Sequence, residues 1–245
     1  VLKREKPDRI PMDYWATYEA SGALMEYLRL ETMHDVYKRL HIDIPVTVSP
    51  EYEGPPLEEN ADMYGCRYCN VNYGTGIYRE CVYHPLAQYN TVEEIEGNYK
   101  WPDIDWYNYD SIPEQIKGYE THPIRGGGSE PFLVYKNLRG QEQALMDLIL
   151  NPDMVHYCLG KLFDFCYENT LRIYEKIPGK VMITYVAEDL GSEKDLMYSP
   201  EQIRTFFLPH MKRMADLVHR AGAYVFTHSD GAIRKIIPDL IEIGV

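Results

Sequence analysis

Basic residues are scarce in this chain. Its 245 residues include 25 lysines and arginines against 38 aspartates and glutamates, which gives a formal net charge of −13 at pH 7. A protein that binds nucleic acid needs a basic surface for the phosphates, and this sequence has no basic stripe. The composition therefore argues against a nucleic-acid partner, although acidity alone names no substrate.

Long apolar runs are also missing, and the cysteines do not form an even set. No stretch approaches the roughly 18 apolar residues of a membrane-spanning helix, and the first residues do not resemble a secretory signal peptide. The five cysteines are an odd number at irregular spacing, which is typical of a reducing compartment. We therefore expect a cytoplasmic protein that does not enter a membrane.

The chain does contain a regular alternation of short apolar strands and helical patterns. The strands are expected at residues 10–15, 43–49, 123–128, 181–187 and 223–228. Strands that alternate with helices indicate an α/β fold with parallel strands. With 45% hydrophobic residues, residues 1–245 can form a single domain around one core.

Helices are expected between these strands and after the last one. Their apolar spacing places them at about residues 16–28, 32–40, 91–95, 138–150, 152–176, 199–222 and 233–243. Ser199 opens one of them with a capping-box pattern, and Asn151 with Pro152 opens another. In the last helix the inward residues are expected to be Ile233, Ile236, Ile237, Leu240 and Ile241.

Residues 51–85 differ in composition from the rest of the chain and are rich in tyrosine and glycine. Alternating residues on either side of Gly74–Gly76 predict an antiparallel hairpin over residues 64–84. We interpret it as a peripheral insertion over one end of the domain. Cys66 and Cys69 within it have the spacing of a metal knuckle, but residues three apart on a strand point to opposite faces, so a metal or redox role is disfavoured.

Two strand ends carry most of the functional signal. The strand at 181–187 ends in Glu188 and Asp189, and the strand at 223–228 ends in His228 followed by Asp230. The carboxyl ends of parallel strands are where α/β folds keep their chemistry. Helix capping and a histidine satisfied by a backbone carbonyl are the alternative interpretation, and only one of Glu188 and Asp189 can point into a site.

Glycines 126–128, at the end of the segment 123–128, and Ser129 after them loosely resemble a phosphate-binding turn. They lack the spacing of a dinucleotide fingerprint and the lysine of a phosphate-binding loop. A tight turn is the favoured interpretation.

Several ordered motifs together resemble the uroporphyrinogen decarboxylase superfamily, and they run through nearly the whole chain. They are Arg9-Ile-Pro-Met-Asp-Tyr-Trp15, Tyr52-Glu-Gly-Pro-Pro56, Arg139-Gly-Gln-Glu-Gln143, Leu148-Ile-Leu-Asn-Pro152, Glu188-Asp-Leu-Gly-Ser192, Ser199-Pro-Glu201 and His228-Ser-Asp-Gly231 with Ile237-Pro-Asp-Leu-Ile-Glu-Ile-Gly244. The resemblance implies a (β/α)8 TIM barrel with its cleft at the carboxyl ends of the strands. It also implies that the chain stops after about five strand–helix units, so that the barrel is truncated.

The resemblance is weakest where true decarboxylases bind their substrate. Their arginine-rich signature after the first strand, which binds porphyrinogen carboxylates, is replaced here by Asp13-Tyr-Trp-Ala-Thr-Tyr-Glu19. Their essential aspartate at the end of the second strand falls near Ser49 and Pro50, with Glu51 the nearest acid. A cleft with few arginines would bind an octacarboxylate badly, so decarboxylation of uroporphyrinogen is disfavoured.

The nearest branch includes methyltransferases that move methyl groups between corrinoid proteins and thiols or other acceptors. The resemblance implies a His-x-Cys zinc motif at the fifth strand end and a later cysteine. His228-Ser-Asp230 stands in that place, so a carboxylate replaces the first thiolate, and zinc accepts oxygen ligands. His228 and Asp230 are thus candidate metal ligands, although we expect no tightly bound metal in this 245-residue chain.

The sequence therefore predicts a corrinoid-linked methyltransferase with a small-molecule substrate and a corrinoid carried by a partner protein; a homodimer is left open. His228, Asp230, Asp189 and Glu188 are the expected catalytic residues. The expected substrate-binding residues are Tyr14, Trp15, Tyr52 and Glu51. Two alternatives stay open: decarboxylation of a porphyrinogen or a smaller carboxylated substrate, and a non-catalytic barrel that binds a tetrapyrrole or a protein.

Overall fold

A computed structural model describes residues 2–245 of the chain. Its centre is a four-stranded parallel sheet in the order β1 (Val46–Val48), β6 (Ile124–Ser129), β7 (Ile183–Val186) and β8 (Tyr224–Phe226). Four of the five expected strands are therefore present, and the α/β class is confirmed. Within the described residues β1 and β8 are the free edges of the sheet, so the strands form an open arc.

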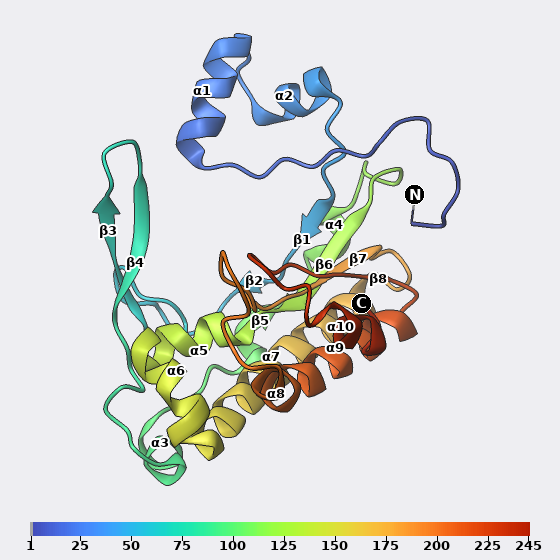
Figure 1. The fold of residues 1–245 in the computed structure, drawn as a ribbon. Helices are drawn as coiled ribbons and strands as arrows, with labels where there is room; N and C mark the ends of the chain where they lie inside the picture. The colour runs from blue at the N-terminus through green and yellow to red at the C-terminus, as the bar shows by residue number, and fades with distance from the viewer. Residues whose placement is uncertain (1) are drawn as a thin grey trace.

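One face of the sheet is covered by helices. Figure 1 shows the long helix α7 (Pro152–Lys176) and helix α9 (Leu208–Arg220) beneath the strands. Around them lie α5 (Pro131–Arg139), α6 (Gln141–Leu150), α8 (Pro200–Gln202), the π-helical segment η2 (Ile203–Phe207) and α10 (Ile237–Glu242). The helix expected over 138–150 is α6 and begins only at Gln141, because Gly140, at φ 86°, separates it from α5, a helix that the sequence analysis did not predict.

The core lies between this face and the helices. Thr184 of β7 points into it, donating to the Gly126 carbonyl at 2.7 Å and bonding the Tyr174 hydroxyl at 2.6 Å. The apolar spacing of residues 152–176 predicts one inward stripe on α7. Four of its residues, Val155, Leu159, Leu162 and Ile173, are buried, and the fifth, Cys166, is partly buried. Pro152 starts α7 and Asn151 takes the N-cap position, but the Asn151 side chain makes no capping bond. Ser199 and Gln202 form the expected capping box.

The last helix is shorter and turned differently from the prediction. Pro238 lies in its first turn, where a proline is accommodated, and α10 covers only residues 237–242. Ile236 and Leu240 are buried as expected, but Ile237 and Ile241 are 43% and 64% exposed. The prediction that all five residues face inward was therefore wrong for these two.

The strand predicted at residues 10–15 is absent, which corrects the N-terminal part of the prediction. The backbone N–H of Asp43 donates to the Met12 carbonyl, and the Arg9 guanidinium grips the Asp43 carboxylate. Pro11 has no N–H to offer to a strand ladder. The segment is therefore fixed beside the residues that precede β1 instead of joining the sheet.

Two small helices follow this segment, on the side of the sheet away from α7 and α9 (Figure 1). They are α1 (Tyr18–Leu28) and α2 (Met33–Leu40), and each begins at a threonine whose hydroxyl caps the first turn, Thr17 and Thr32 respectively. No side chain of α1 is buried.

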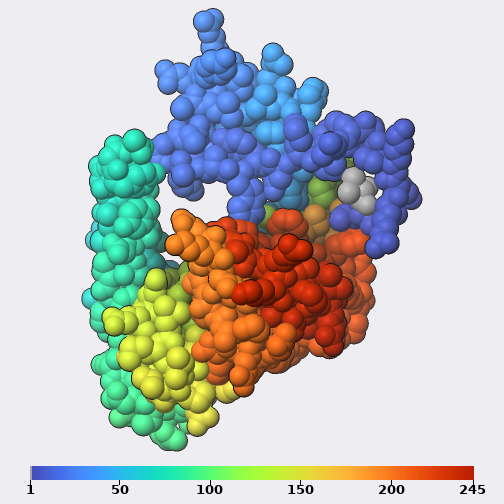
Figure 2. Space-filling model, viewed as in Figure 1, coloured from blue at the N-terminus to red at the C-terminus, as the bar shows by residue number. Residues whose placement is uncertain are grey.

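The antiparallel hairpin expected over 64–84 consists of β3 (Arg67–Asn72) and β4 (Ile77–Tyr83). Its tip reaches α1, where the Ile77 N–H donates to Oε1 of Glu19 at 3.1 Å. At its base Cys66 is buried while Cys69 is exposed, and both are free. Figure 2 shows an opening bounded by the hairpin in teal, α1 and α2 in blue, and the loops after β7 and β8 in orange and red.

The remaining elements join the hairpin to the sheet. They are β2 (Glu51–Tyr52), which pairs antiparallel with β5 (Tyr107–Asn108), and the helices α3 (Val92–Asn98), η1 (Ile104–Trp106) and α4 (Ile112–Gln115). Thr91 caps α3, the helix expected at about residues 91–95.

Candidate functional site

The loops that follow β7 and β8 are bonded to each other. The N–H of Asp230 donates to Oδ1 of Asp189 at 3.1 Å, and the N–H of Leu190 donates to the Ser229 hydroxyl at 2.9 Å. A backbone bond from Ala232 to the Ser192 carbonyl adds a third link at 2.8 Å. The carboxyl ends of two neighbouring parallel strands are thus held together.

Two glycines make this approach possible. A Cβ on Gly191 would lie 2.7 Å from the carbonyl oxygen of Asp230 and 2.8 Å from the nitrogen of Ala232. Gly231 has φ 77°, and its Cβ would lie 2.4 Å from the Ser192 carbonyl oxygen. Both contacts are with backbone, which cannot move aside cheaply, so glycine is required at each position.

This packing brings Asp189, His228 and Asp230 together. Nε2 of His228 lies 3.4 Å from Oδ1 of Asp189 and 3.6 Å from Oδ1 of Asp230. One donor atom from each of the three residues lies within 4.8 Å of the others. His228 and Asp189 are about one-third exposed and Asp230 is mostly exposed, so a small molecule can reach the cluster.

Aromatic rings flank the imidazole. The ring of Tyr185 stacks near His228 with centroids 6.3 Å apart, and the indole of Trp15 lies 6.1 Å from it. The Trp15 N–H donates to Oδ2 of Asp13 at 2.9 Å, which orients an indole that is 61% exposed. Trp15 is one of the expected substrate-binding residues, and its ring lies beside the cluster.

Glu130 is a neighbour of the cluster that the sequence analysis did not single out. It directly follows β6, so each of three adjacent parallel strands is followed by an acid within four residues. Partial burial raises the pKa of the Glu130 carboxyl, and the nearby Asp189 charge raises it further, while His228 opposes the shift. The signal that could have found it is its position directly after the strand at 123–128.

Glu188 points away from the cluster. It is buried, and its Oε1 accepts from the Phe132 N–H in the first turn of α5 at 3.0 Å. Burial raises the pKa of this carboxyl well above its usual range. Of the two adjacent acids, only Asp189 therefore faces His228, in keeping with the opposite-face rule for neighbouring residues on a strand.

The other predicted substrate-binding residues have different neighbours. The Tyr14 hydroxyl bonds the Ser21 hydroxyl at 3.2 Å, and its ring lies beside Tyr37. Tyr52 donates to the Pro55 carbonyl, and Glu51 pairs in β2 and is exposed. Among the described contacts none joins these three residues to His228, and their expected role in substrate binding stays a prediction.

The donor set of the cluster is suited to two kinds of chemistry. One imidazole and two carboxylates are ligand types that zinc and other divalent metals accept. Without a metal, an imidazole beside carboxylates is the arrangement of a general base. Tyr185 cannot supply a phenolate at neutral pH, because burial and then the Glu130 charge raise its pKa to about 12.

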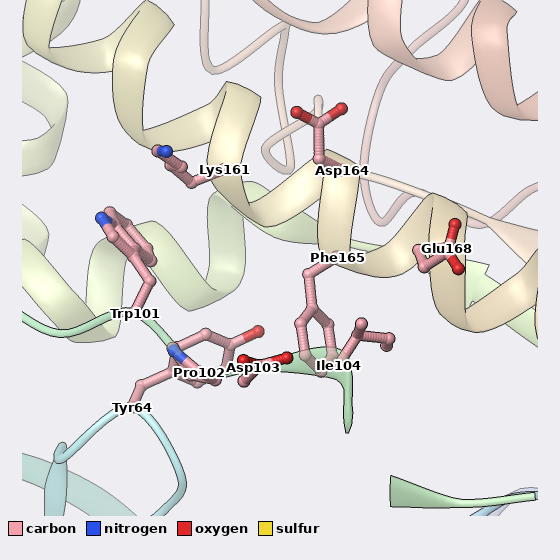
Figure 3. A pocket seen from close by; sticks show the side chains of 9 residues that line it. All are labelled: Tyr64, Trp101, Pro102, Asp103, Ile104, Lys161, Asp164, Phe165 and Glu168. Carbon is pink, nitrogen blue, oxygen red and sulfur yellow. The ribbon is translucent and has the colours of Figure 1, made fainter. Parts of the chain in front are cut away.

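A separate cavity of about 310 Å³ lies between α7 and the loop before η1 (Figure 3). Lys161, Asp164 and Glu168 project from α7 at its rim, and Trp101 and Tyr64 lie at the other side. Asp164 and Glu168 are paired with Arg213 and Arg172. None of the predicted site residues lines this cavity.

The sequence of the chain matches one family description. The uroporphyrinogen decarboxylase (URO-D) family matches residues 106–245, more than half of the chain, and this part contains β6, β7, β8 and the whole Asp189–His228–Asp230 cluster. The protein belongs to the uroporphyrinogen decarboxylase family.

Structural comparison shows what fold the chain shares. A methyltransferase from Methanosarcina mazei superposes with a TM-score of 0.63 at 19% identity, over 99% of this chain and 71% of that one. At this identity the likeness establishes the fold. No curated protein sequence matches the chain.

Among the helices of residues 2–245, none has the length and apolar character that a membrane crossing requires.

Proposed function

We propose that this protein is a methyltransferase that moves a methyl group between a corrinoid carried by a partner protein and a small acceptor or donor, with Asp189, His228 and Asp230 as its reaction site. The observation that carries the proposal is the convergence of the His228 imidazole with two carboxylates at the carboxyl ends of β7 and β8. The similarity of the fold to that of a methyltransferase supports methyl transfer as the class of reaction.

The residues next to the cluster argue for methyl transfer over porphyrinogen decarboxylation. The segment Asp13-Tyr-Trp15 lies beside the cluster through the ring of Trp15, and it contributes an indole and a carboxylate. A porphyrinogen with many carboxylates would meet the charges of Asp189, Asp230 and Glu130, which repel it.

The cluster can prepare an acceptor for methylation. A neutral His228 takes the proton from an acceptor X–H, and the lone pair on X then attacks the methyl carbon. The bond between that carbon and its carrier breaks, and its electron pair stays with the carrier. Asp189 and Asp230 stabilise the imidazolium that results.

A divalent metal fits the same donor set. Asp189, His228 and Asp230 would hold it, and when bound it would act as a Lewis acid toward the acceptor. A carboxylate-rich set favours oxygen or nitrogen acceptors over soft thiols.

The test is demethylation of methylcobalamin, followed by the absorbance change of the corrinoid, with oxygen, nitrogen and sulfur acceptors offered separately. Wild-type protein is expected to accelerate demethylation with an oxygen or nitrogen acceptor. In parallel, uroporphyrinogen and smaller carboxylic acids are tested for carbon dioxide release. Carbon dioxide release without methyl transfer would favour the decarboxylase alternative, which the family assignment keeps open.

A further inference from the structure

Arg125 carries a positive charge on the face of the sheet that the helices do not cover. Its neighbours in β6 face α7: a Cβ on Gly126 would touch Ile173 and Val181. The Arg125 side chain points the other way, and its Nε donates to the Thr47 hydroxyl of β1 at 3.0 Å. The guanidinium is thereby fixed in position on the open face.

This guanidinium has no carboxylate partner among residues 2–245. The fully buried Arg139, by contrast, is paired with Asp147 at 2.7 Å. Arg125 is partly buried, and its only recorded side-chain bond is the one to Thr47. A guanidinium that has no carboxylate partner keeps its remaining N–H donors for an anionic ligand.

A cavity of about 590 Å³ lies against Arg125. Its sheet side consists of apolar and aromatic side chains, namely Met182, Ile183, Tyr224 and Phe226. The register of the strands places Arg125 beside Ile183 and Ile183 beside Tyr224, so these residues share one face. The opposite wall is the N-terminal segment, with Pro11 and Met12.

The charges on the N-terminal segment do not neutralise Arg125. The Arg9 and Asp43 side chains at the rim are paired with each other, and Asp13 accepts from the Trp15 indole. Lys3, Glu5 and Asp8 also line the segment side, and no ion pair joins Glu5 or Asp8 to Arg125 among the described residues. The cation on the sheet side therefore lies next to apolar walls.

We propose that this face of the sheet binds an amphipathic carboxylate, with the carboxylate on the Arg125 guanidinium and the apolar body against Ile183, Tyr224 and Phe226. The planar fork of an arginine accepts a carboxylate through two parallel hydrogen bonds, and the apolar walls desolvate the rest of the molecule. This binding does not depend on the methyl-transfer proposal.

Calorimetric titration with 1-naphthaleneacetate and its neutral amide, 1-naphthaleneacetamide, tests the proposal. The wild-type protein should bind the carboxylate more tightly than the amide. Arg125→Met keeps the apolar length and removes the charge, so it should weaken carboxylate binding by about 10- to 100-fold and leave amide binding unchanged. Arg125→Lys should fall between the two.

Arg220→Met is the matched control, because Arg220 lies on α9, bonds the Tyr167 hydroxyl and does not line the cavity. It should bind both probes as the wild type does. Equal wild-type affinity for carboxylate and amide, or no saturable binding of either, would overturn the proposal without any variant. So would a folded Arg125→Met protein that binds the carboxylate at wild-type affinity.

Discussion

The backbone of Asp230 is bonded to the side chain of Asp189: the Asp230 N–H donates to the Asp189 carboxylate at 3.1 Å. The bond orients the Asp189 carboxylate while its Oδ1 also lies 3.4 Å from Nε2 of His228. The geometry of the cluster therefore depends on how closely the two loops pack.

Gly191→Ala tests that dependence. The new Cβ would lie 2.7 Å from the Asp230 carbonyl oxygen, so the loops must separate. We expect a loss of about 1–3 kcal/mol in the free energy of unfolding, measured by urea denaturation, together with loss of activity. Gly160→Ala is the control, because Gly160 lies within α7 with nothing within 4 Å of its Cβ. It should stabilise the protein by about 0.4–1 kcal/mol; equal effects of the two substitutions would contradict this account.

The buried pair Arg139–Asp147 stabilises the junction of α5 and α6. Asp147 accepts from Arg139, from the Tyr135 hydroxyl and from Gln143, and the guanidinium also donates to two backbone carbonyls. Asp147→Ala leaves a buried unpaired cation and should cost about 3–5 kcal/mol in the free energy of unfolding. Asp216→Ala, which removes the exposed pair with Lys212, should cost under about 1 kcal/mol. A small effect at Asp147 in urea denaturation would show that the junction does not depend on the pair.

The raised pKa of the Glu188 carboxyl predicts how the free energy of unfolding depends on pH. Burial raises its pKa in the folded state well above the usual range of a glutamate, so the folded protein keeps a proton that the unfolded chain releases. The stabilisation of the folded protein by this proton is fully present below about pH 4 and is lost as the pH rises through the folded-state pKa. Glu188→Gln keeps an acceptor for the Phe132 N–H and cannot ionise. Relative to the wild type it should therefore gain stability between pH 5 and pH 8, as measured by thermal unfolding in matched buffers. A constant difference between the two proteins over that range would refute the assignment.

The metal hypothesis makes a separate prediction. Because one ligand is a mostly exposed carboxylate and no thiolate is present, the purified 245-residue protein is expected to contain less than one zinc per chain by elemental analysis. Added zinc should bind saturably in calorimetry, and His228→Ala should abolish that binding. Zinc that binds His228→Ala as well as it binds the wild type would place the metal elsewhere.

The local patterns in the sequence predicted much of the fold. Strand–helix alternation after residue 123, the Ser199 cap and the buried stripe of α7 all depend on neighbours in sequence. The missing strand at residues 10–15 depended on a distant partner, since Asp43 fixes that segment through Arg9 and Met12.

The candidate site also contains residues that the sequence predicted and residues that it could not predict. His228 and Asp230 follow the same predicted strand two residues apart, so a shared site could be predicted, and the position of Asp189 followed from the neighbouring strand. Glu130 and the contact of Trp15 with His228 could not be predicted, because they depend on which strands and segments become neighbours in three dimensions.

The central claim is that Asp189, His228 and Asp230 are the reaction site, and the most direct measurement is the rate of corrinoid demethylation in single-residue variants. His228→Ala and Asp189→Asn should each lower the rate by at least about 100-fold, whereas Glu193→Gln, an exposed acid on the same loop, should leave it unchanged. Circular dichroism and thermal unfolding would establish that each variant is folded. Wild-type rates in folded His228→Ala and Asp189→Asn proteins would contradict the account.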